Sequence, residues 1–483
     1  MIQGTTSSAG KSVVTAGICR LFASRGLKVA PFKPQNMALN SAVTVEGGEI
    51  GRSQAVQAMA AGLEPENDMN PILLKPNTDQ GAQVIVNGQA IGNMEAVDYH
   101  AFKAEAVRSV MDAYNRLCEK YDVVIVEGAG SPAEVNLRHN DIANMGFATR
   151  AQCPVLLCAD IDRGGVFAHL TGTLSCLEKN EVDLIKGFII NRFRGDKSLL
   201  TSGLDWLTEQ TGKPTLGVLP FLKGLHIEAE DSVEKENIRG ETAQSPLKIV
   251  VPRISRISNH TDFDVLRLQS GVELIYVEAG QTIPPADLVV LPGSKNTISD
   301  LNWLIQHDWP SYINRHLRYG GKLIGICAGF QMIGKQIHDP SGLEGPAESR
   351  QGLGLMDFET VLEPHKQLTR VEGRFFGFEG ARVRGYEIHM GKTTGPALDH
   401  PAIQLHEKVD GVISGDGQIL GTYLHGLFDH EEACKALLKW AGFKGEVVQD
   451  YDRLRQKAFD RVAAMLDEEI GFETLYEVAQ STV

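Results

Sequence analysis

The sequence lacks the features that mark membrane, secreted and nucleic-acid-binding proteins. It has no run of about twenty apolar residues, and its N-terminus lacks the order of charged, apolar and small residues that a signal peptide requires. The chain has fewer basic than acidic residues. It contains 47 Lys and Arg and 61 Asp and Glu, which gives a net charge of −14. Nucleic acids and anionic membranes both need a broad basic surface, so we expect a cytoplasmic protein with neither as partner.

The cysteines show no pattern for a disulfide framework or a zinc site. There are seven, an odd number, they are scattered over the chain, and no two have the CxxC spacing. We expect most of them to be small core residues.

A chain of 483 residues is too long for a single hydrophobic core. The distribution of its apolar runs predicts two α/β domains. Short β-rich runs alternate with helical segments in residues 1–230, which predicts a doubly wound parallel sheet covered on both faces. Residues 231–247 are charged and poor in apolar groups, so we expect a linker. The alternation resumes in residues 248–435, and the helical spacing in residues 436–483 predicts a helical extension of the second domain.

A glycine-rich segment ending in Gly-Lys-Ser lies near the start of the chain and precedes an apolar helical run. Small residues let backbone N–H groups converge on one anion, and the helix dipole adds to the attraction, which predicts a phosphate-binding P-loop. Lys11 is expected to reach the β- and γ-phosphates of ATP, and Ser12 to bind Mg²⁺. The alternative is a turn that only begins a helix. The residues expected to contact ATP are Gly4, Thr5, Thr6, Ser7, Ser8, Ala9, Gly10, Lys11 and Ser12.

The strand before this loop is short. Only Met1, Ile2 and Gln3 precede Gly4, whereas a mean strand has about five or six residues. We therefore expect the true start of the chain to lie upstream of residue 1.

Acidic residues near the loop are candidate metal ligands, because parallel sheets bind ligands at the carboxyl ends of their strands. Glu127 follows the predicted strand 122–126 and is expected to join Ser12 as a ligand of Mg²⁺, which prefers oxygen. Glu49 is a weaker candidate for the same metal. The alternatives are a carboxylate that caps a turn and a solvated loop residue.

Further polar side chains follow the predicted strands 28–32, 154–158 and 185–190. A lysine and amides after the first strand are expected to bind a polar or carboxylate substrate, and two acids after the second to contact substrate or metal. Turn formation and pairing among the charged groups are the alternatives. The residues expected to bind substrate are Lys33, Gln35, Asn36, Asn40, Asp160 and Asp162, and those expected to complete the ATP site are Asn191 and Arg192.

The second domain contains a Gly-x-Cys-x-Gly turn centred on Cys327, directly after the predicted strand 322–326. Glycines on either side permit the sharp strand-to-helix elbow that exposes a nucleophile, and the helix N-terminus favours the thiolate. Backbone N–H groups of Gly293 and Ala328 are the expected oxyanion hole. The expected base is His425, which lies at a glycine turn. A structural cysteine and a structural histidine are the alternatives.

The order of the N-terminal motifs resembles that of the cobyric acid synthase family. The motifs are the P-loop with its long spacer, Lys33-Pro34-Gln35-Asn36-Met37, Val126-Glu127-Gly128-Ala129-Gly130-Ser131, Asp160-Ile161-Asp162-Arg163-Gly164-Gly165 and Ile190-Asn191-Arg192-Phe193. The resemblance implies a fold related to dethiobiotin synthetase, in which ATP phosphorylates a carboxylate and ammonia displaces the phosphate.

The second domain resembles the variant class I glutamine amidotransferase domain of the cobyric and cobyrinic acid enzymes. Class I domains commonly carry His-Pro-Glu, whereas this chain has His425-Gly426-Leu427, so the triad acid is missing from its usual place. Segments 259–264 and 385–391 also resemble segments typical of the cobyric acid enzyme. Asp262, Glu387 and His389 within them either line a site or a domain interface or are packed polar residues.

The resemblance implies amidation of the b, d, e and g carboxylates of adenosylcobyrinic a,c-diamide, with ATP, glutamine and the corrinoid as ligands. Mg²⁺ is expected with ATP, and no tightly bound cofactor is expected because the corrinoid is the substrate. The nearest alternative is cobyrinic acid a,c-diamide synthase. The others are a non-ligase P-loop regulator, against which the Cys/His domain argues, and a degenerate amidotransferase domain used only for binding. The oligomeric state is not predicted.

Overall fold

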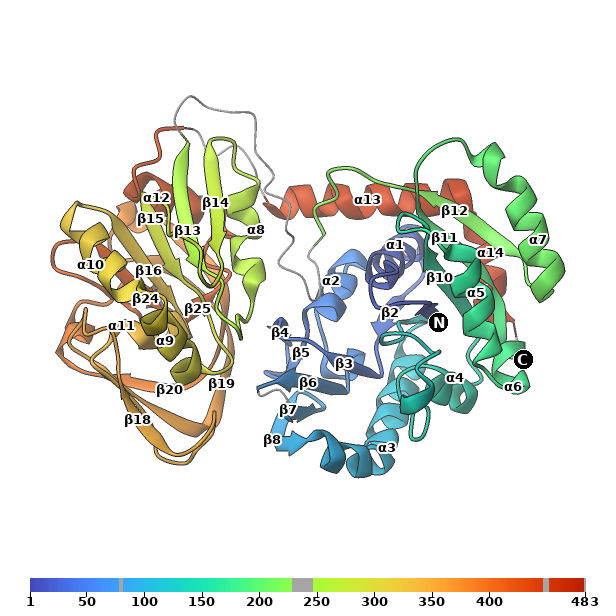
Figure 1. Cartoon of the computed structure of the whole chain (residues 1–483), viewed down its shortest axis with the longest axis horizontal. Coiled ribbons are helices and arrows are strands. Elements are labelled where there is room, and N and C mark those ends of the chain that lie inside the picture. Colours follow the sequence, from blue (N-terminus) through green and yellow to red (C-terminus); the bar gives the residue numbers. More distant parts are fainter. Residues whose placement is uncertain (78–80, 228–245, 446–450, 482–483) are drawn as a thin grey trace. The chain divides into compact units, whose positions relative to one another are not determined.

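The computed structural model describes residues 1–77, 81–227, 246–445 and 451–481, and the chain forms two compact units (Figure 1). The first unit comprises Met1–Ala38, Thr44–Glu230 and Arg455–Val483. The second comprises Leu39–Val43 and Asp231–Leu454. Most of the predicted linker 231–247 lies outside the described residues.

The first unit is built on a parallel sheet, as predicted. Four strands pair in the order β1-β10-β11-β12, and β2 pairs with β9. A parallel bridge between Ile2 and Glu127 and a hydrogen bond from Gly128 N to Ile2 O (2.9 Å) join β9 to β1. The strands are β1 (Ile2–Gly4), β2 (Val29–Phe32), β9 (Val123–Val126), β10 (Val155–Asp160), β11 (Ile185–Phe193) and β12 (Thr215–Pro220).

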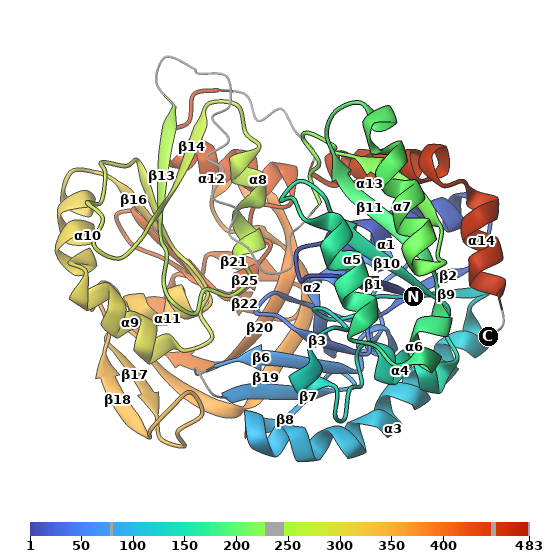
Figure 2. The ribbon, with the colours of Figure 1, turned by 45° about the vertical axis from the view of Figure 1, so that its right-hand side comes forward.

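Alternate residues of β10 enter two different cores, which shows that both faces of this sheet are covered. Leu156 and Cys158 pack with α1 (Lys11–Ser24), whereas Val155, Leu157 and Ala159 pack with helices on the other face. Figure 2 shows α5 and α7 near these strands. The helices of the second core are α4 (Met145–Ala151), α5 (Val166–Ser175), α6 (Lys179–Leu184) and α7 (Thr201–Thr211).

A small second sheet of the first unit was not predicted from the sequence. Its strands pair in the order β3-β6-β7-β8, and β3 lies inside the segment that the sequence indicated to be a polar loop. The elements around it are β3 (Gln35–Met37), β5 (Glu49–Gly51), α2 (Arg52–Ala60), β6 (Ile72–Pro76), β7 (Gly81–Val86), β8 (Gln89–Glu95) and α3 (Ala96–Lys120). None of the described helices of the chain is long and apolar enough to cross a membrane.

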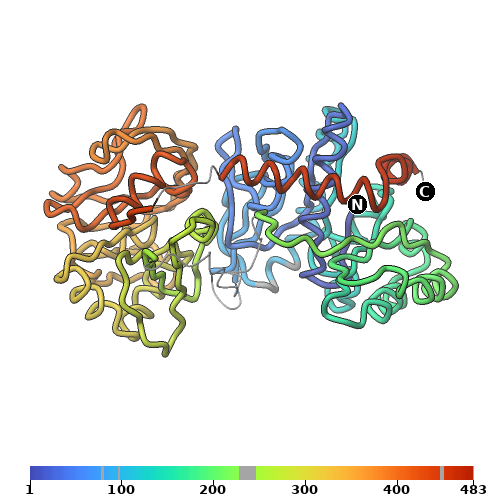
Figure 3. Tube along the Cα trace, turned by 90° about the horizontal axis from the view of Figure 1, so that it is seen from above, coloured from blue at the N-terminus to red at the C-terminus, as the bar shows by residue number. Residues whose placement is uncertain are grey.

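The prediction that the helical tail 436–483 extends the second domain was wrong from Arg455 onward. Residues from Arg455 onward belong to the first unit, where Val462 and Leu466 are buried against Ile18 and other residues of α1. Figure 3 shows this C-terminal segment beside the N-terminal segment. The tail helices are α13 (Tyr451–Glu469) and α14 (Phe472–Gln480).

The second unit contains a six-stranded sheet in the order β14-β13-β15-β16-β24-β23, in which β23 alone is antiparallel to its neighbour. The strand predicted over residues 322–326 is confirmed as β16. The strands are β13 (Leu247–Pro252), β14 (Val272–Val277), β15 (Leu288–Leu291), β16 (Lys322–Ile326), β23 (Val412–Ile413) and β24 (Ile419–Thr422).

A second, mixed sheet of this unit is dominated by a long hairpin formed by β19 and β20. Its strands are β17 (Gln336–Asp339), β18 (Glu348–Gln351), β19 (Glu359–Phe375), β20 (Arg382–Thr394), β21 (Ile403–Leu405), β22 (Val409–Asp410) and β25 (Leu424–His425). The remaining elements are β4 (Ser41–Val43), α8 (Asp264–Arg267), α9 (Thr297–Gln306), α10 (Trp309–Arg318), α11 (Ala328–Ile333) and α12 (Glu431–Trp440).

Candidate active sites

The glycine-rich segment forms a tight turn between β1 and the N-terminus of α1. Gly10 has φ 92°, a left-handed conformation that glycine adopts without strain. Asn191 at the end of β11 donates from Nδ2 to the carbonyl of Ala9 (2.9 Å). A Cβ at Gly10 would lie only 2.2 Å from that Nδ2 atom. Asn191, predicted to contact the nucleotide, therefore supports the turn from behind in this structure.

Lys11 and Ser12 begin α1 at the base of the turn. The ammonium of Lys11 is held by the carbonyl oxygens of Thr6 (3.0 Å), Ser7 (3.2 Å) and Gly130 (2.9 Å). Ser12 Oγ donates to Glu127 Oε1 (2.8 Å). The two residues predicted to be the principal Mg²⁺ ligands, 115 positions apart in the sequence, are thus adjacent.

The carboxylate of Glu127 is completely buried and is surrounded by donors. Lys33 Nζ lies 3.1 Å from Oε1, and Gln57 Nε2 donates to Oε2 (2.5 Å). A carboxylate next to a serine hydroxyl is an oxygen donor set that suits Mg²⁺. The described residues contain no group of three or more His, Cys, Asp or Glu side chains placed to hold a metal ion. Phosphate oxygens and water would therefore have to supply most ligands.

Glu49, the weaker metal candidate, forms a buried ion pair with Lys75 in β6 (2.7 Å). Of the predicted substrate residues, Gln35 accepts a hydrogen bond from Tyr99 (2.7 Å) and Asn36 donates to Gln54 (2.9 Å). Glu49 and Asn36 are buried in the first unit, whereas Gln35 is half-buried.

The two predicted acids at the end of β10 pair with Arg192 in β11 and with Arg194 directly after it, rather than with Arg163. Asp160 lies 3.0 Å from Arg192, and Asp162 lies 2.8 Å from Arg194. The strand pairing explains this arrangement, because β10 and β11 are parallel neighbours that end at the same edge. Arg192 has φ 63°, so the chain turns sharply at this edge.

Asn40 lies in the second unit rather than with the other predicted substrate residues. Its Oδ1 accepts a hydrogen bond from the backbone N–H of His260 (3.1 Å), and Ser41 N donates to Asn259 Oδ1 (3.1 Å). Both contacts are buried.

Cys327 has the geometry of a nucleophile elbow. It has φ 54° and ψ −109°, a strained conformation for a residue with a side chain, between β16 and α11. A Cβ at Gly329 would lie 2.1 Å from the carbonyl oxygen of Leu291, so only glycine allows this turn to approach β15. The thiol donates to the carbonyl of Ile388 (3.5 Å).

His425 reaches the same place from the neighbouring strand. Because β16 and β24 are parallel, with Ile326 opposite Thr422, Cys327 and His425 both follow the carboxyl ends of these strands. The His425 side chain is buried, and its Nε2 makes no hydrogen bond to a nitrogen or oxygen atom of the described residues. Burial lowers the pKa of His425, but the negative charge of Asp262 and the adjacent Cys327 outweigh it and raise the pKa to about 10.

The acid beside His425 is Asp262, which the sequence left open as a residue of a site, of a domain interface or of the polar packing. Its Oδ2 lies 2.7 Å from His425 Nδ1, and its Oδ1 accepts from Gly426 N (2.8 Å). Asp262 follows β13, whose carboxyl end lies at the same edge of the sheet as those of β15 and β16. That edge is the one signal in the sequence from which this residue could have been selected.

The other polar residues flagged near this site have separate partners. Glu387 forms an ion pair with Lys408 (2.5 Å). His389 bonds Gly391 O through Nδ1 (2.9 Å), and burial lowers its pKa to about 3. Gly293, a predicted oxyanion donor, lies against the histidine, because a Cβ there would be 3.0 Å from His425 Cε1.

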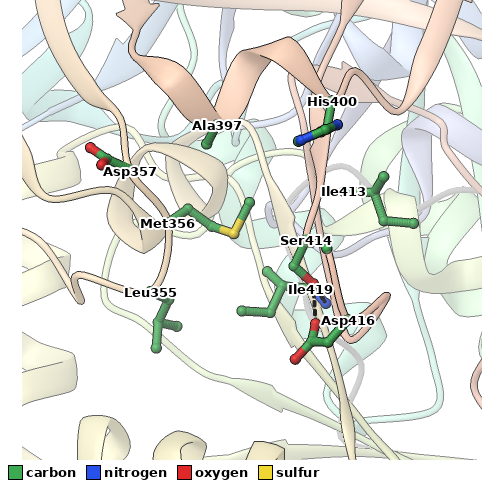
Figure 4. A pocket seen from close by; sticks show the side chains of 10 residues that line it. Leu355, Met356, Asp357, Ala397, His400, Ile413, Ser414, Asp416 and Ile419 are labelled. Atoms are coloured by element: carbon green, nitrogen blue, oxygen red, sulfur yellow. Dashed lines mark hydrogen bonds between the residues drawn. The ribbon is translucent and has the colours of Figure 1, made fainter.

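A cavity of about 470 Å³ in the second unit lies away from this chemistry. Ile419 at the beginning of β24 lines it, together with Met356, His400 and Asp416 (Figure 4). Cys327 and His425 lie beyond the other end of the sheet strands, so we do not assign the cavity to the glutamine site.

Two family models match the chain. Residues 1–233 match the CobQ/CobB/MinD/ParA nucleotide binding domain, and residues 248–433 match the CobB/CobQ-like glutamine amidotransferase domain. The protein is therefore a glutamine amidotransferase with a nucleotide-binding domain, a carbon–nitrogen ligase. More particularly, the chain belongs to the CobB/CobQ-like family of cobalamin biosynthesis.

Solved structures resemble parts of the chain. PurLQS from Thermotoga maritima is 15% identical over 45% of this chain and 98% of that chain, with a TM-score of 0.30. A glutamine amidotransferase from the same organism is 15% identical over 49% of this chain and 99% of that chain, with a TM-score of 0.28. The signal recognition particle receptor FtsY from Elizabethkingia anophelis is 15% identical over 46% of this chain and 58% of that chain, with a TM-score of 0.26.

Proposed function

We propose that this ligase amidates the b, d, e and g carboxylates of adenosylcobyrinic a,c-diamide, using ATP and glutamine, to give adenosylcobyric acid. The observation that carries the proposal is that one chain of the CobB/CobQ-like family holds two separate sets of groups. Ser12 and Glu127 lie together at the P-loop, and Cys327 lies with His425 in the other unit.

The glutamine half of the reaction uses the cysteine and histidine. The Cys327 proton resides on His425 Nε2 in a thiolate–imidazolium pair, the Cys327 sulfur attacks the glutamine amide carbon, and the C–N bond breaks as His425 gives the proton to departing ammonia. Water activated by His425 then attacks the thioester, which releases glutamate and restores the thiol. Backbone N–H groups of Gly293 and Ala328 are the proposed donors to the oxyanion.

The ligase half uses the P-loop of the first unit. Lys11 and the N-terminus of α1 neutralise and position the phosphates, and the substrate carboxylate takes the γ-phosphoryl group to form an acyl phosphate. Ammonia attacks the acyl carbon, and phosphate leaves. Ser12 and Glu127 are the residues that would hold Mg²⁺, which when bound neutralises phosphate charge.

Residues that touch ATP or the corrinoid remain part of the proposal. Gly4–Ser12 are proposed for the triphosphate, with Asn191 and Arg192 beside them. Lys33, Gln35, Asn36, Asp160 and Asp162 are proposed to line or support the acceptor site. Buried lysine and amide groups support this choice, because a carboxylate-rich substrate requires donors that are already held in place.

A second candidate is cobyrinic acid a,c-diamide synthase, because both enzymes share the two domains. The cobyric acid reaction is preferred on the resemblance of the Lys33–Ser41 and Gly385–Gly391 segments to that enzyme.

Mass spectrometry decides between the two. The enzyme is incubated with Mg-ATP, glutamine and either adenosylcobyrinic a,c-diamide or cobyrinic acid. The proposal predicts four successive acid-to-amide mass changes on the diamide. An unchanged diamide, with two amidations of cobyrinic acid, would assign the protein to the second candidate.

A further inference from the structure

Asp262 is placed to control the histidine of the glutamine site. Its two carboxylate oxygens make different bonds, one to His425 Nδ1 (2.7 Å) and one to the backbone N–H of Gly426 (2.8 Å). Both side chains of the pair are almost fully buried, at 2% and 1% exposure. A buried carboxylate beside an imidazole is costly unless the contact is well formed, and here both oxygens are bonded.

The bond to Nδ1 fixes the state of the imidazole ring. An ionised carboxylate only accepts hydrogen bonds, so Nδ1 must carry a proton and Nε2 is the atom left to exchange one with Cys327. The same contact holds the ring plane, which also stacks on Tyr386 with centroids 5.5 Å apart.

The loop that carries Asp262 is itself held in place. Asn259 adopts φ 52° and begins a short 3₁₀ turn, His260–Phe263, in which Asp262 N donates to Asn259 O (3.0 Å). Ser258 N donates to Gly293 O (3.0 Å), and Asn40 accepts from His260 N (3.1 Å). The carboxylate is thus supported from both sides of its turn.

We propose that Asp262 is the positioning residue of the glutaminase site and replaces, from a loop 163 residues away, the acid that class I domains carry two residues after the histidine. Asp262 does not touch glutamine. It selects the tautomer of His425 and stabilises the imidazolium that forms during catalysis. The inference concerns glutamine hydrolysis alone and is independent of which corrinoid accepts the ammonia.

The variant Asp262→Asn tests the positioning role. Its amide oxygen can still accept a hydrogen bond from Gly426 N, but the side chain no longer offers a charged acceptor to His425 Nδ1–H. By the behaviour of other nucleophile–histidine–acid sites, we expect kcat for glutamine hydrolysis to fall roughly 10²- to 10⁴-fold with little change in KM. The matched control is Asp264→Asn, two residues further on, which is expected to hydrolyse glutamine like the wild type.

A second readout separates positioning from general damage. The rate at which iodoacetamide modifies Cys327 at neutral pH is followed by mass spectrometry of the Cys327 peptide, because Cys118 is exposed and would react as well, whereas Cys327 is buried. Thiolate reacts and thiol does not, so Asp262→Asn should slow this rate, and Asp262→Glu, which keeps the charge, should restore part of it. The titratable groups whose charges act on His425 are Asp262 and Cys327, and Tyr386 stacks on the ring.

The outcomes are distinct. Slower hydrolysis and slower alkylation in Asp262→Asn, with both partly restored in Asp262→Glu, support the proposal. Hydrolysis within threefold of wild type, or equal losses in Asp262→Asn and Asp262→Glu with unchanged alkylation, overturn it. Should Asp262→Asn not fold, Asp262→Glu alone decides: alkylation of Cys327 at a substantial part of the wild-type rate supports the role of the charge, and alkylation as slow as that of the buried Cys158 contradicts it.

Discussion

Opposing electrostatic influences act on His425. Burial disfavours the imidazolium, while Asp262 and Cys327 favour it, and the balance raises the pKa to about 10. A group with a raised pKa keeps its proton as the pH rises until that pKa is approached. The imidazolium needed to protonate departing ammonia therefore persists well above neutrality.

The pH profile of glutamine hydrolysis tests whether the His425 imidazolium persists above neutral pH. We expect kcat/KM to remain high through neutral pH and to decline on the alkaline side near pH 10. His389→Gln is the matched control, because a histidine with its pKa lowered to about 3 stays neutral throughout and should leave this alkaline limb in place. An alkaline limb near pH 7 in the wild type would show that the imidazolium is not stabilised.

At the scale of single residues, the sequence predicted a functional residue where the pattern that marks it lies in neighbouring positions. Cys327 could be selected because Gly325 and Gly329 flank it, and the structure places it in a strained elbow. Asp262 could not be paired with His425, because no local pattern encodes a contact between residues 163 apart. Lys33 and Glu127 were each predicted as site residues, but no pattern in the sequence indicated that they form an ion pair.

The elbow illustrates how an element is fixed by the absence of a side chain. Gly329 is the second residue of α11, and the turn lies so close to β15 that a Cβ would be 2.1 Å from Leu291 O. A backbone carbonyl cannot move aside as a flexible side chain can. Any larger residue must therefore displace α11 and, with it, the thiol.

We predict that Gly329→Ala loses glutamine hydrolysis by at least about 10²-fold, since a shift of about 1 Å in a reacting group has effects of that size. Gly345→Ala is the control in the same unit, because a Cβ there meets no atom within 4 Å and should change the rate little. Steady-state kinetics of both purified variants provide the measurement. Near-normal hydrolysis by Gly329→Ala would be inconsistent with the elbow.

The C-terminal helices show what periodicity can and cannot predict. The spacing of Leu454, Phe459, Val462 and Leu466 indicated one buried face, and the last three are buried whereas Leu454 is half-buried. Periodicity gives no information about the surface against which that face packs, and here it packs on the first unit. The buried strands were predictable for a different reason, since short apolar runs ending in polar or glycine residues resemble few other elements.

This packing predicts where the tail contributes stability. Leu466→Ala should destabilise the first unit by about 2–5 kcal/mol, because Leu466 is fully buried next to Gly17. The exposed Glu468→Ala should change stability by less than about 0.5 kcal/mol. The measurement is thermal unfolding with and without ATP, in which the transition raised by ATP reports the first unit. A selective loss in the other transition would refute the assignment of the tail.

At the scale of the whole molecule, the chain combines two chemistries in two units. In the proposed reaction, nucleotide binding rests on Lys11 and Ser12 in the first unit, and thiol chemistry rests on Cys327 in the second. Ammonia is the only product of the second site that the first requires. Ammonia supplied in solution should therefore bypass the second site but never the first.

Substitution of Lys11 removes the charge that the P-loop directs at the phosphates. Lys11→Ala should lower amidation by at least about 10²-fold with either glutamine or ammonium as nitrogen source, since one positioned cation is worth that much in phosphoryl transfer. Glutamine hydrolysis measured without ATP should be preserved as evidence of folding. Amidation near the wild-type rate would contradict the phosphate role of Lys11.

The most direct test of the two-site account is amidation of the corrinoid by Cys327→Ala, measured with glutamine and then with ammonium salt. Removal of the thiol should lower glutamine-supported amidation by at least about 10³-fold, because no covalent intermediate can form, and leave ammonium-supported amidation at the rate of the wild type. Loss of both activities in a folded variant, or survival of the glutamine-supported reaction, would contradict the account.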